Sequence, residues 1–350
     1  MEGTVRKTVV ISAVSIRKGG TLTILRQWLE EWSAMTGQYR VIALVHDRKL
    51  CDFPGIEYIE MPWCTKSWAF RLWAEYVTMY RMSLDLEKQD GQTVWKWISM
   101  HDTTPRVKAL HRQVYCQTSF PFMKPSLKDF RFDPKIPLFT MFTRWVYKIN
   151  SKQNECMIVQ QNWFREALSG LIGYPMEKIK VMPPKLQPSF QPMPEAAGQE
   201  LFPYPVFLYA STPDCHKNFE TLCKAAVLLE KELGKDRFKV ILTVKGNENR
   251  YARYLFSHWG DCSSIDFHGL MTKQELFATY AKAHCLVFPS RIETWGLPIS
   301  EYMSANPNGR MILSDLPYAH ETSAGGNAVF FDCHNPNELA GLMKSVIEEQ

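Results

Sequence analysis

The chain alternates between strand-like and helix-like segments along most of its length, and this rhythm limits the fold more than any other feature. Apolar, β-branched runs such as KTVVISAVSI (residues 7–16) and YRVIALVHD (residues 39–47) have the pattern of buried strands. The segment between them, TLTILRQWLEEWSAM (residues 21–35), has the pattern of an amphipathic helix. The alternation therefore predicts an α/β protein with mainly parallel sheets.

A proline-rich run over residues 183–205 interrupts the rhythm, and it marks a linker because proline continues neither a helix nor a central strand. The alternation then restarts with the strand-like segments VFLYAS, FKVILTVKG, SIDFHG, HCLVFPS, RMILSD and AVFFD. A chain of 350 residues also exceeds the roughly 250–300 residues that one core supports. We expect a Rossmann-like domain over residues 1–182, a linker over 183–204 and a second Rossmann-like domain over 205–350. The last helix of the second domain, from Asn335, is a candidate to pack on the first.

Composition excludes several classes of protein. Charged residues make up 22% and hydrophobic residues 45%, as in ordinary soluble proteins. The net charge of +5 suits a protein that handles anions such as phosphates but is too small to indicate nucleic acid. The nine cysteines are scattered without zinc-ligand spacing, and no signal peptide or membrane-spanning run is evident. These features favour a cytoplasmic protein with reduced thiols.

The stretch FPSRIETWGLPISEYMS (residues 288–304) carries two glutamates at a point where a strand should end and a helix begin. Glu293 falls on the expected loop and Glu301 about a turn into the helix, while Gly296 lets the backbone approach a ligand closely. Carboxylates accept strong hydrogen bonds from hydroxyl groups, so the pair suits a ligand with hydroxyls at both ends, such as a nucleotide sugar. The alternative is one glutamate near the helix dipole and one on a solvated face.

Lys217 follows another expected strand and begins the next helix, where free backbone N–H groups favour phosphate. A solvated surface lysine is the alternative. No Gly-x-Gly-x-x-Gly motif follows the first strand, which disfavours a nicotinamide oxidoreductase.

These motifs together resemble the retaining glycosyltransferases of family 4, of the bacterial surface-polysaccharide type. LVFPSRIETWGLPISEYMSA resembles their E-x7-E signature, HKNFETLCKA is similar to their phosphate loop, and KGGTLTILRQWLEEW looks like their Gly-Gly turn and first helix. VQQNWFREAL and SDLPYAHETSAGGNAVFFD match further family segments, so the resemblance covers nearly the whole chain. It implies the GT-B fold, in which two doubly wound Rossmann-like domains face a central cleft.

The resemblance also implies roles for individual residues. Glu293 would contact the transferred sugar, Glu301 the ribose and Lys217 the diphosphate. The remaining donor-binding residues would be Gly19, Gly20, Arg291, Thr294, Trp295, Gly296 and Leu297. The family needs neither a metal nor another cofactor. Its stereochemistry is retained, with the leaving phosphate taking the acceptor proton.

The sequence departs from the family pattern at two positions. Many relatives carry a histidine near the donor sugar, where Gln117 stands here, and His101 is the other candidate because it too ends an expected strand. Glutamine can hydrogen-bond a sugar hydroxyl but cannot carry positive charge. Asp214 stands where relatives often have an arginine, and Arg291 or Lys245 would have to replace that charge.

The first domain is expected to bind the acceptor, a glycan or a lipid-linked sugar. Two segments interleave basic and aromatic residues, MPWCTKSWAFRLWAEYVTMYRM and FPFMKPSLKDFRFDPKIPLFTMFTRWVYK. They suit peripheral contact with the inner face of the plasma membrane, the alternative being core stripes with solvated basic faces. Two other functions stay open: a non-catalytic partner subunit that binds sugar nucleotides, and a GT-B nucleotide-sugar epimerase.

Overall fold

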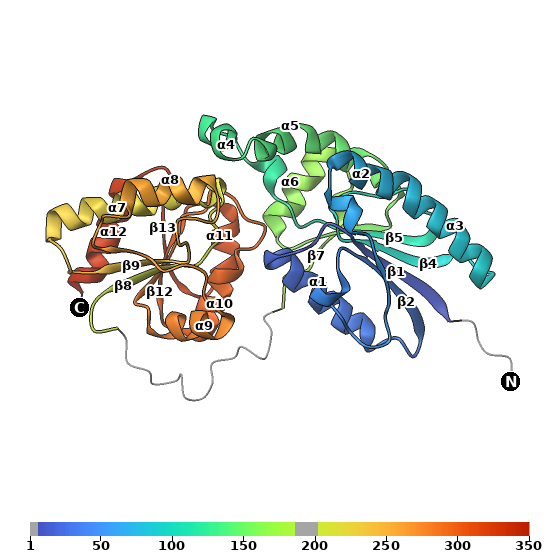
Figure 1. Ribbon diagram of the computed structural model, residues 1–350, viewed down its shortest axis with the longest axis horizontal. Helices are drawn as coiled ribbons and strands as arrows, with labels where there is room; N and C mark the ends of the chain where they lie inside the picture. Colours follow the sequence, from blue (N-terminus) through green and yellow to red (C-terminus); the bar gives the residue numbers. More distant parts are fainter. Residues whose placement is uncertain (1–5, 186–201, 350) are drawn as a thin grey trace. The chain divides into compact units, whose positions relative to one another are not determined.

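The structure, a computed structural model, describes residues 6–185 and 202–349 and divides the chain into two compact units (Figure 1). Unit 1 comprises Met1–Pro121 and Met141–Lys185, and unit 2 comprises Phe122–Thr140 and Leu186–Gln350. Each unit is built on a parallel sheet, so the prediction of two Rossmann-like domains is confirmed. Most of the expected linker, 183–204, lies outside the described residues.

Unit 1 alternates between strands and helices, as predicted for the first half of the chain. Its strands are β1 (Lys7–Ala13), β2 (Tyr39–Val45), β3 (Glu57–Glu60), β4 (Val94–Ser99), β5 (Ala109–Tyr115), β6 (Cys156–Val159) and β7 (Ile179–Val181). Its helices are α1 (Gly19–Ser33), α2 (Trp68–Trp73), α3 (Met79–Asp90) and α6 (Asn162–Ile172), together with most of α5 (Lys135–Lys148). A π-helical turn, Ala74–Thr78, joins α2 to α3.

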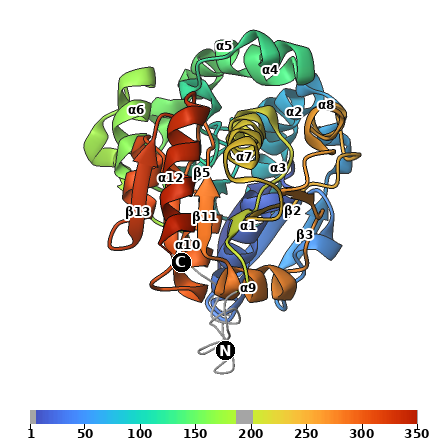
Figure 2. The same ribbon diagram turned by 90° about the vertical axis from the view of Figure 1, so that its left-hand side faces the viewer.

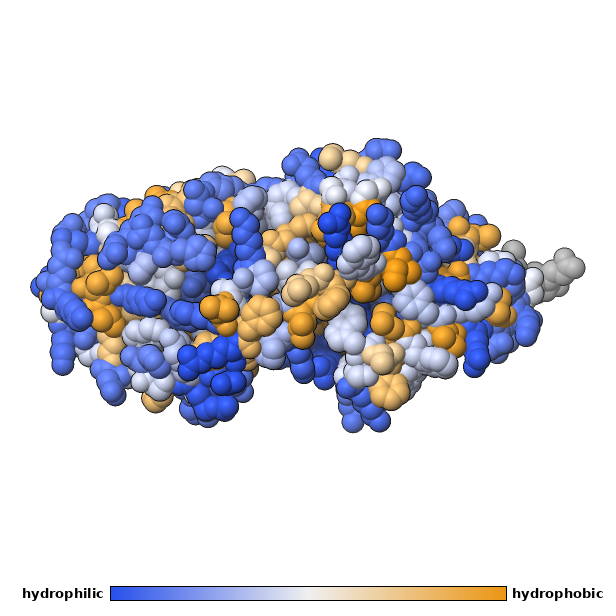
Figure 3. All heavy atoms as spheres, turned by 90° about the horizontal axis from the view of Figure 1, so that it is seen from above, coloured by the Kyte–Doolittle hydropathy of each residue, from blue (hydrophilic) through white to orange (hydrophobic). Residues whose placement is uncertain are grey.

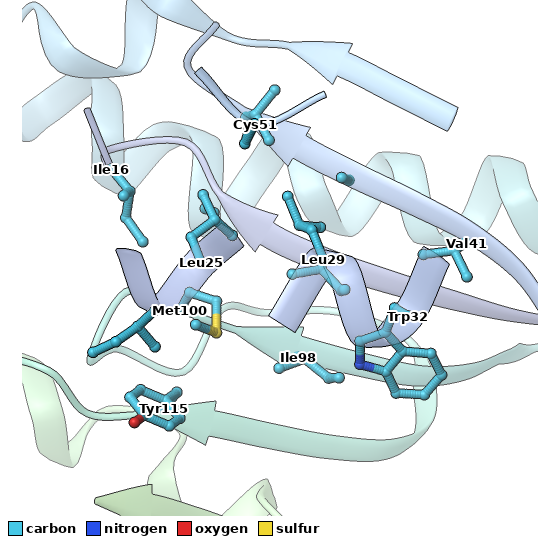
Figure 4. Close-up of a cluster of buried hydrophobic side chains, with 14 of the residues drawn as sticks. Ile16, Leu25, Leu29, Trp32, Val41, Cys51, Ile98, Met100 and Tyr115 are labelled. Carbon is cyan, nitrogen blue, oxygen red and sulfur yellow. The ribbon is translucent and has the colours of Figure 1, made fainter. Parts of the chain in front are cut away.

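The unit 1 sheet has the strand order β3-β2-β1-β4-β5-β6-β7. All of its pairs are parallel, so strands that follow in sequence reach their neighbours through crossover connections, and the order reverses between β1 and β4. Leu25 and Leu29 of α1 pack with Val41, Ile98 and other apolar strand residues in the core of this unit (Figure 4). The apolar strand runs thus became the buried centre of the sheet.

Unit 2 repeats the architecture. Its strands are β8 (Val206–Tyr209), β9 (Lys239–Leu242), β10 (Ile265–Phe267), β11 (Cys285–Phe288), β12 (Arg310–Ser314) and β13 (Asn327–Phe331). Its helices are α4 (Leu127–Phe132), α7 (Phe219–Leu233), α8 (Arg250–Trp259), α9 (Lys273–Lys282), α10 (Leu297–Ala305), α11 (Pro317–Thr322) and α12 (Pro336–Glu348). The parallel strand order β10-β9-β8-β11-β12-β13 reverses between β8 and β11. In an open parallel sheet, ligands bind at such a reversal, beyond the carboxyl ends of the strands.

The last helix, α12, packs against α7 and β12 of its own unit, as Figure 2 shows for the two helices. Its buried residues Leu339, Met343 and Val346 recur at helical spacing and form the packing face. From its sequence, this helix was a candidate to pack on the first domain. Its buried face is accounted for by contacts within unit 2.

The segment Phe122–Thr140 groups with unit 2, although the sequence places it inside the expected range 1–182. Phe132 at the end of α4 lies against the rings of Tyr251 and Tyr254 of α8, with centroids 5.2 and 4.9 Å away. Lys128 forms an ion pair with Glu220 of α7. Helix α4, which we expected in the first domain, therefore belongs to unit 2, because its aromatic and charged contacts are made with α7 and α8.

In residues 6–185 and 202–349, no helix has both the length and the apolar character that crossing a membrane requires.

Candidate functional site

The loops after β8 and β11 meet at the strand reversal of unit 2, and they bring Lys217 and Glu293 together. Lys217 ends a short 3₁₀ turn, Cys215–Lys217, that follows β8. Its ammonium lies 2.5 Å from a carboxylate oxygen of Glu293, and the two side chains are only 15% and 13% exposed. A positive and a negative group thus stand side by side at the edge where the fold favours a ligand.

Hydrogen bonds from neighbouring strands fix the Lys217 loop. Asn218 adopts a left-handed conformation with φ of 57°, and its side-chain amide donates to the carbonyls of Pro289 and Cys333 over 3.1 and 2.7 Å. The Tyr209 hydroxyl donates to the carbonyl of Lys217 over 2.7 Å. Residues from β8 and from the ends of β11 and β13 therefore set the position of Lys217 before any ligand arrives.

The turn between β11 and α10 depends on Gly296. Its φ of +85° lies in the left-handed region, and a Cβ there would approach the Ile299 side chain to 3.1 Å. The Trp295 indole donates to the Ser300 hydroxyl over 2.8 Å, and the Thr322 hydroxyl donates to the Trp295 carbonyl. This part of the signature is a rigid turn at the start of a helix, as the sequence predicted.

Glu301 lies on α10 and has a lysine partner of its own. Its carboxylate is 2.8 Å from the ammonium of Lys273 at the start of α9, and the Glu301 side chain is 12% exposed. The two glutamates therefore bind separate cations, Glu293 with Lys217 and Glu301 with Lys273. Nothing in the sequence marked Lys273, which lies 28 residues before Glu301.

Arg291, a proposed source of positive charge, is bound to Asp129 of α4. One of its guanidinium nitrogens lies 3.2 Å from the Asp129 carboxylate and the other closer still, with both side chains largely buried. Burial of Asp129 opposes its ionisation, yet the Arg291 hydrogen bonds and the Ser126 N–H outweigh this and lower the pKa of Asp129. The positive charge of Arg291 is thus already balanced, and no local pattern in the sequence links residue 129 to residue 291.

Asp214 and Lys245 occupy loops beside this centre. The Asp214 carboxylate accepts a hydrogen bond from the Thr212 hydroxyl over 2.6 Å. Lys245 is exposed after β9, where the Glu248 carboxylate accepts the backbone N–H groups of Lys245 and Gly246 over 2.6 and 2.9 Å. The structure pairs Lys217, and neither of these residues, with the signature glutamate.

In unit 1, His101 lies just beyond β4 and holds the loop after β1. Its Nε2 accepts the backbone N–H of Val14 and its Nδ1 contacts the Ser15 hydroxyl, each over 3.2 Å. The ring is buried, and burial followed by the charge of Arg71 lowers the pKa of His101 well below its usual value. Both ring nitrogens therefore serve the loop that leads to Gly19 and Gly20, which are exposed at the start of α1.

Gln117 lies at the end of β5, where Asp102 organises its backbone. The Asp102 carboxylate accepts the N–H groups of Gln117 and Thr118 over 2.5 and 2.9 Å. The Gln117 side-chain amide donates to the Met100 carbonyl over 3.3 Å, while its buried Oε1 has no hydrogen-bond partner among the described residues. Gln117 thus retains an acceptor, and His101 does not have a comparable free nitrogen.

Acidification is expected to destabilise both units through buried histidines. Burial lowers the folded-state pKa of His101 and of His216 well below the usual value, so below about pH 6.5 only the unfolded chain gains these protons. Stability is full above that pH and falls as the pH drops towards the folded-state values, by about 1.4 kcal/mol per pH unit for each histidine. Urea unfolding at a series of pH values measures this slope. A His101→Gln variant with an unchanged slope would contradict the assignment.

Comparison with protein families finds a match in the C-terminal part of the chain. Residues 197–350 match the family model described as Glycosyl transferases group 1. No curated protein matches the sequence significantly.

Solved structures match nearly the whole chain. Sucrose-phosphate synthase from Thermosynechococcus elongatus has a TM-score of 0.70 at 14% identity, over 98% of this chain and 90% of that one. HepE from Anabaena in complex with UDP and glucose has a TM-score of 0.66 at 12% identity, over 97% and 90%. WaaG, a glycosyltransferase involved in lipopolysaccharide biosynthesis, has a TM-score of 0.65 at 14% identity, over 97% and 93%. The shared fold and the family match over residues 197–350 support a glycosyltransferase with the GT-B fold.

Proposed function

We propose that this chain is a retaining glycosyltransferase of family 4 that transfers a sugar from a nucleotide-sugar donor. Its acceptor would be a glycan or a lipid-linked sugar in bacterial surface-polysaccharide synthesis. The observation that carries the proposal is the Lys217–Glu293 pair at the strand reversal of unit 2, within the residues that match the family model. An ammonium suited to a diphosphate and a carboxylate suited to sugar hydroxyls stand next to each other there.

The pair can exchange partners when a donor binds. A diphosphate competes with Glu293 for the Lys217 ammonium, and the released carboxylate becomes free to accept hydrogen bonds from the sugar. Glu301, held by Lys273, would accept the ribose hydroxyls. The loops need little rearrangement, because Asn218 and Gly296 already fix their backbones. Of the two candidates in unit 1, Gln117 is better suited than His101 to accept a hydrogen bond from a hydroxyl group, since its Oε1 has no partner among the described residues.

Metal independence is part of the proposal. The Lys217 ammonium and the N-terminal end of α10, which begins at Leu297, would stabilise charge on the leaving diphosphate. Turnover is therefore expected to persist in EDTA, measured as nucleotide released per minute. Loss of turnover in EDTA that added Mg²⁺ restores would refute this part of the proposal.

Nucleotide binding is expected to raise the melting temperature. UDP is the first candidate, since UDP occupies the HepE complex and the complex of a TarM variant. A nucleotide at about 100 times its Kd stabilises the folded state by about 2.7 kcal/mol. A thermal-shift screen of UDP, GDP, ADP and their sugars measures this effect. The Lys217→Met variant should lose the shift, whereas Lys235→Met, an exposed lysine of the same unit, should keep it.

Transfer itself separates the proposal from its alternatives. Incubation with the stabilising donor and a panel of glycan acceptors should give a glycoside whose anomeric configuration, read by NMR, equals that of the donor. Nucleotide binding with no release of nucleotide from any donor would indicate a non-catalytic subunit. A changed sugar formed without acceptor would indicate an epimerase. Cytoplasmic location with peripheral membrane contact completes the proposal, and the surface of unit 1 bears on it.

A further inference from the structure

One face of α5 exposes large apolar side chains at helical spacing. Met141, Phe142 and Trp145 are 58%, 59% and 69% exposed, and Ile149 beyond the helix end is 47% exposed. The opposite face is buried, with Thr143 and Tyr147 at 2% and 1%. The apolar stripe that normally faces a core therefore points outward here, while a second face fixes the helix to the protein.

Helix α2 adds to this surface. Phe70 and Trp73 are 48% and 58% exposed on α2. Burial raises the pKa of Tyr147 on α5, and the nearby charge of Arg71 on α2 opposes this rise, so the two helices are neighbours. Figure 3 shows hydrophobic side chains gathered on the face of the molecule that carries these helices. We call Phe70, Trp73, Met141, Phe142, Trp145 and Ile149 the α5–α2 surface.

The charged side chains within the two segments that carry the α5–α2 surface have one sign. Residues 135–149 include Lys135, Arg144 and Lys148 but no aspartate or glutamate, and residues 66–73 also lack acidic side chains. Arg144 and Lys148 are exposed, and neither forms an ion pair with any residue of the described ranges. Such a surface is complementary to an anionic partner. It is a poor match for a second copy of itself, because bases would then face bases.

We propose that the α5–α2 surface docks on an anionic lipid bilayer. Trp145, Phe142 and Met141 enter the headgroup region with α5 lying in the plane of the interface, and Arg144 and Lys148 contact lipid phosphates. Tryptophan is favoured at this depth because its ring is apolar and its N–H is polar. This inference deepens the proposed function and rests on it for the lipid-linked acceptor. Docking itself requires no catalytic step.

Vesicle co-sedimentation tests the proposal with the full-length protein. Vesicles of phosphatidylcholine alone are compared with vesicles that also contain phosphatidylglycerol. We expect binding to the anionic vesicles, weakened by added salt because exposed charges are screened over about 10 Å at 0.1 M ionic strength. Tryptophan fluorescence should shift to the blue on binding, since the exposed Trp145 and Trp73 leave water.

Variants with matched controls test whether the α5–α2 surface makes the contact with the vesicle. Arg144→Gln with Lys148→Gln should weaken vesicle binding about 25-fold, from about 1 kcal/mol for each basic residue near an anionic surface. Trp145→Ser should weaken it about tenfold or more, because a large apolar side chain no longer leaves water. Lys235→Gln and Leu270→Ser, which alter an exposed lysine and an 89% exposed leucine of unit 2, should leave binding unchanged.

The outcomes separate docking from catalysis. Absence of wild-type binding to anionic vesicles, or equal losses in the α5 and control variants, would overturn the proposal. A concentration-dependent dimer that Trp145→Ser abolishes, without vesicle binding, would assign the surface to a second copy instead. The nucleotide-induced thermal shift should be the same in Trp145→Ser and wild type. Thermal shift therefore tests the proposed donor site, and vesicle binding tests the proposed docking.

Discussion

A Glu293→Gln variant is expected to lose roughly 100-fold in kcat while binding the nucleotide as tightly as the wild type or more tightly. Glutamine keeps the shape of the side chain but removes the negative charge that accepts hydrogen bonds from the sugar as charge develops. The same change releases the Lys217 ammonium, 2.5 Å away, for the diphosphate. Steady-state kinetics and nucleotide titration calorimetry measure the two effects separately.

Glu301→Ala is the matched comparison, because this glutamate is equally buried but belongs to a different ion pair. Loss of a hydrogen bond to a charged group costs about 1.5–3 kcal/mol, which corresponds to a Kd for nucleotide roughly 10 to 100 times higher. The kcat at saturating donor should fall far less. If both variants change kcat and nucleotide Kd by the same factors, the division between sugar contact and ribose contact is wrong.

An Asp129→Asn variant is expected to destabilise unit 2 by about 3–5 kcal/mol, as loss of one partner does in a buried ion pair. Arg291 would keep its charge in a site where its side chain is only 12% exposed and its carboxylate partner is gone. The change also weakens the start of α4, because the Asp129 carboxylate accepts the Ser126 N–H over 2.7 Å. Urea unfolding, followed by circular dichroism, measures the loss.

Two further variants make this result specific. Asp129→Asn combined with Arg291→Met removes both charges and should recover part of the lost stability, since no uncompensated buried charge remains. Glu232→Gln breaks the exposed Glu232–Lys344 pair and should cost less than about 1 kcal/mol. An Asp129→Asn cost as small as that of Glu232→Gln would show that the α4 contact contributes little.

The α4 contact also links sequence positions that are far apart to the candidate site. Arg291 donates its backbone N–H to the His216 carbonyl over 2.9 Å, between the Lys217 turn and the Glu293 loop. By binding the Arg291 guanidinium, Asp129 thus helps to hold the Glu293 loop against the Lys217 turn. Because α4 lies close ahead of α5 in the chain, the proposed docking of α5 and the proposed donor site involve the same stretch of sequence.

Much of the fold followed from local patterns. Apolar, β-branched runs predicted β1, β2 and the six strands of unit 2, because parallel strands covered on two faces must be apolar throughout. The turn before α10 was predicted at the strand-to-helix junction that carries Gly296, since the backbone preference of glycine acts locally and needs no distant partner. The exchange of Phe122–Thr140 into unit 2 was not predicted, because the contacts that hold it join residues about 90 to 160 positions apart.

The sequence alone determined the two α/β units, the placement of Lys217 and Glu293 after strand ends and that of Glu301 on the following helix, because periodicity and turn chemistry depend on residues close together in the chain. Only the tertiary structure decided which charges meet. Lys217 lies with Glu293, Arg291 with Asp129 and Glu301 with Lys273, and none of these pairs is local in sequence. The reason is physical: a partly buried charge takes the partner that packing brings within reach, and packing depends on the whole sheet.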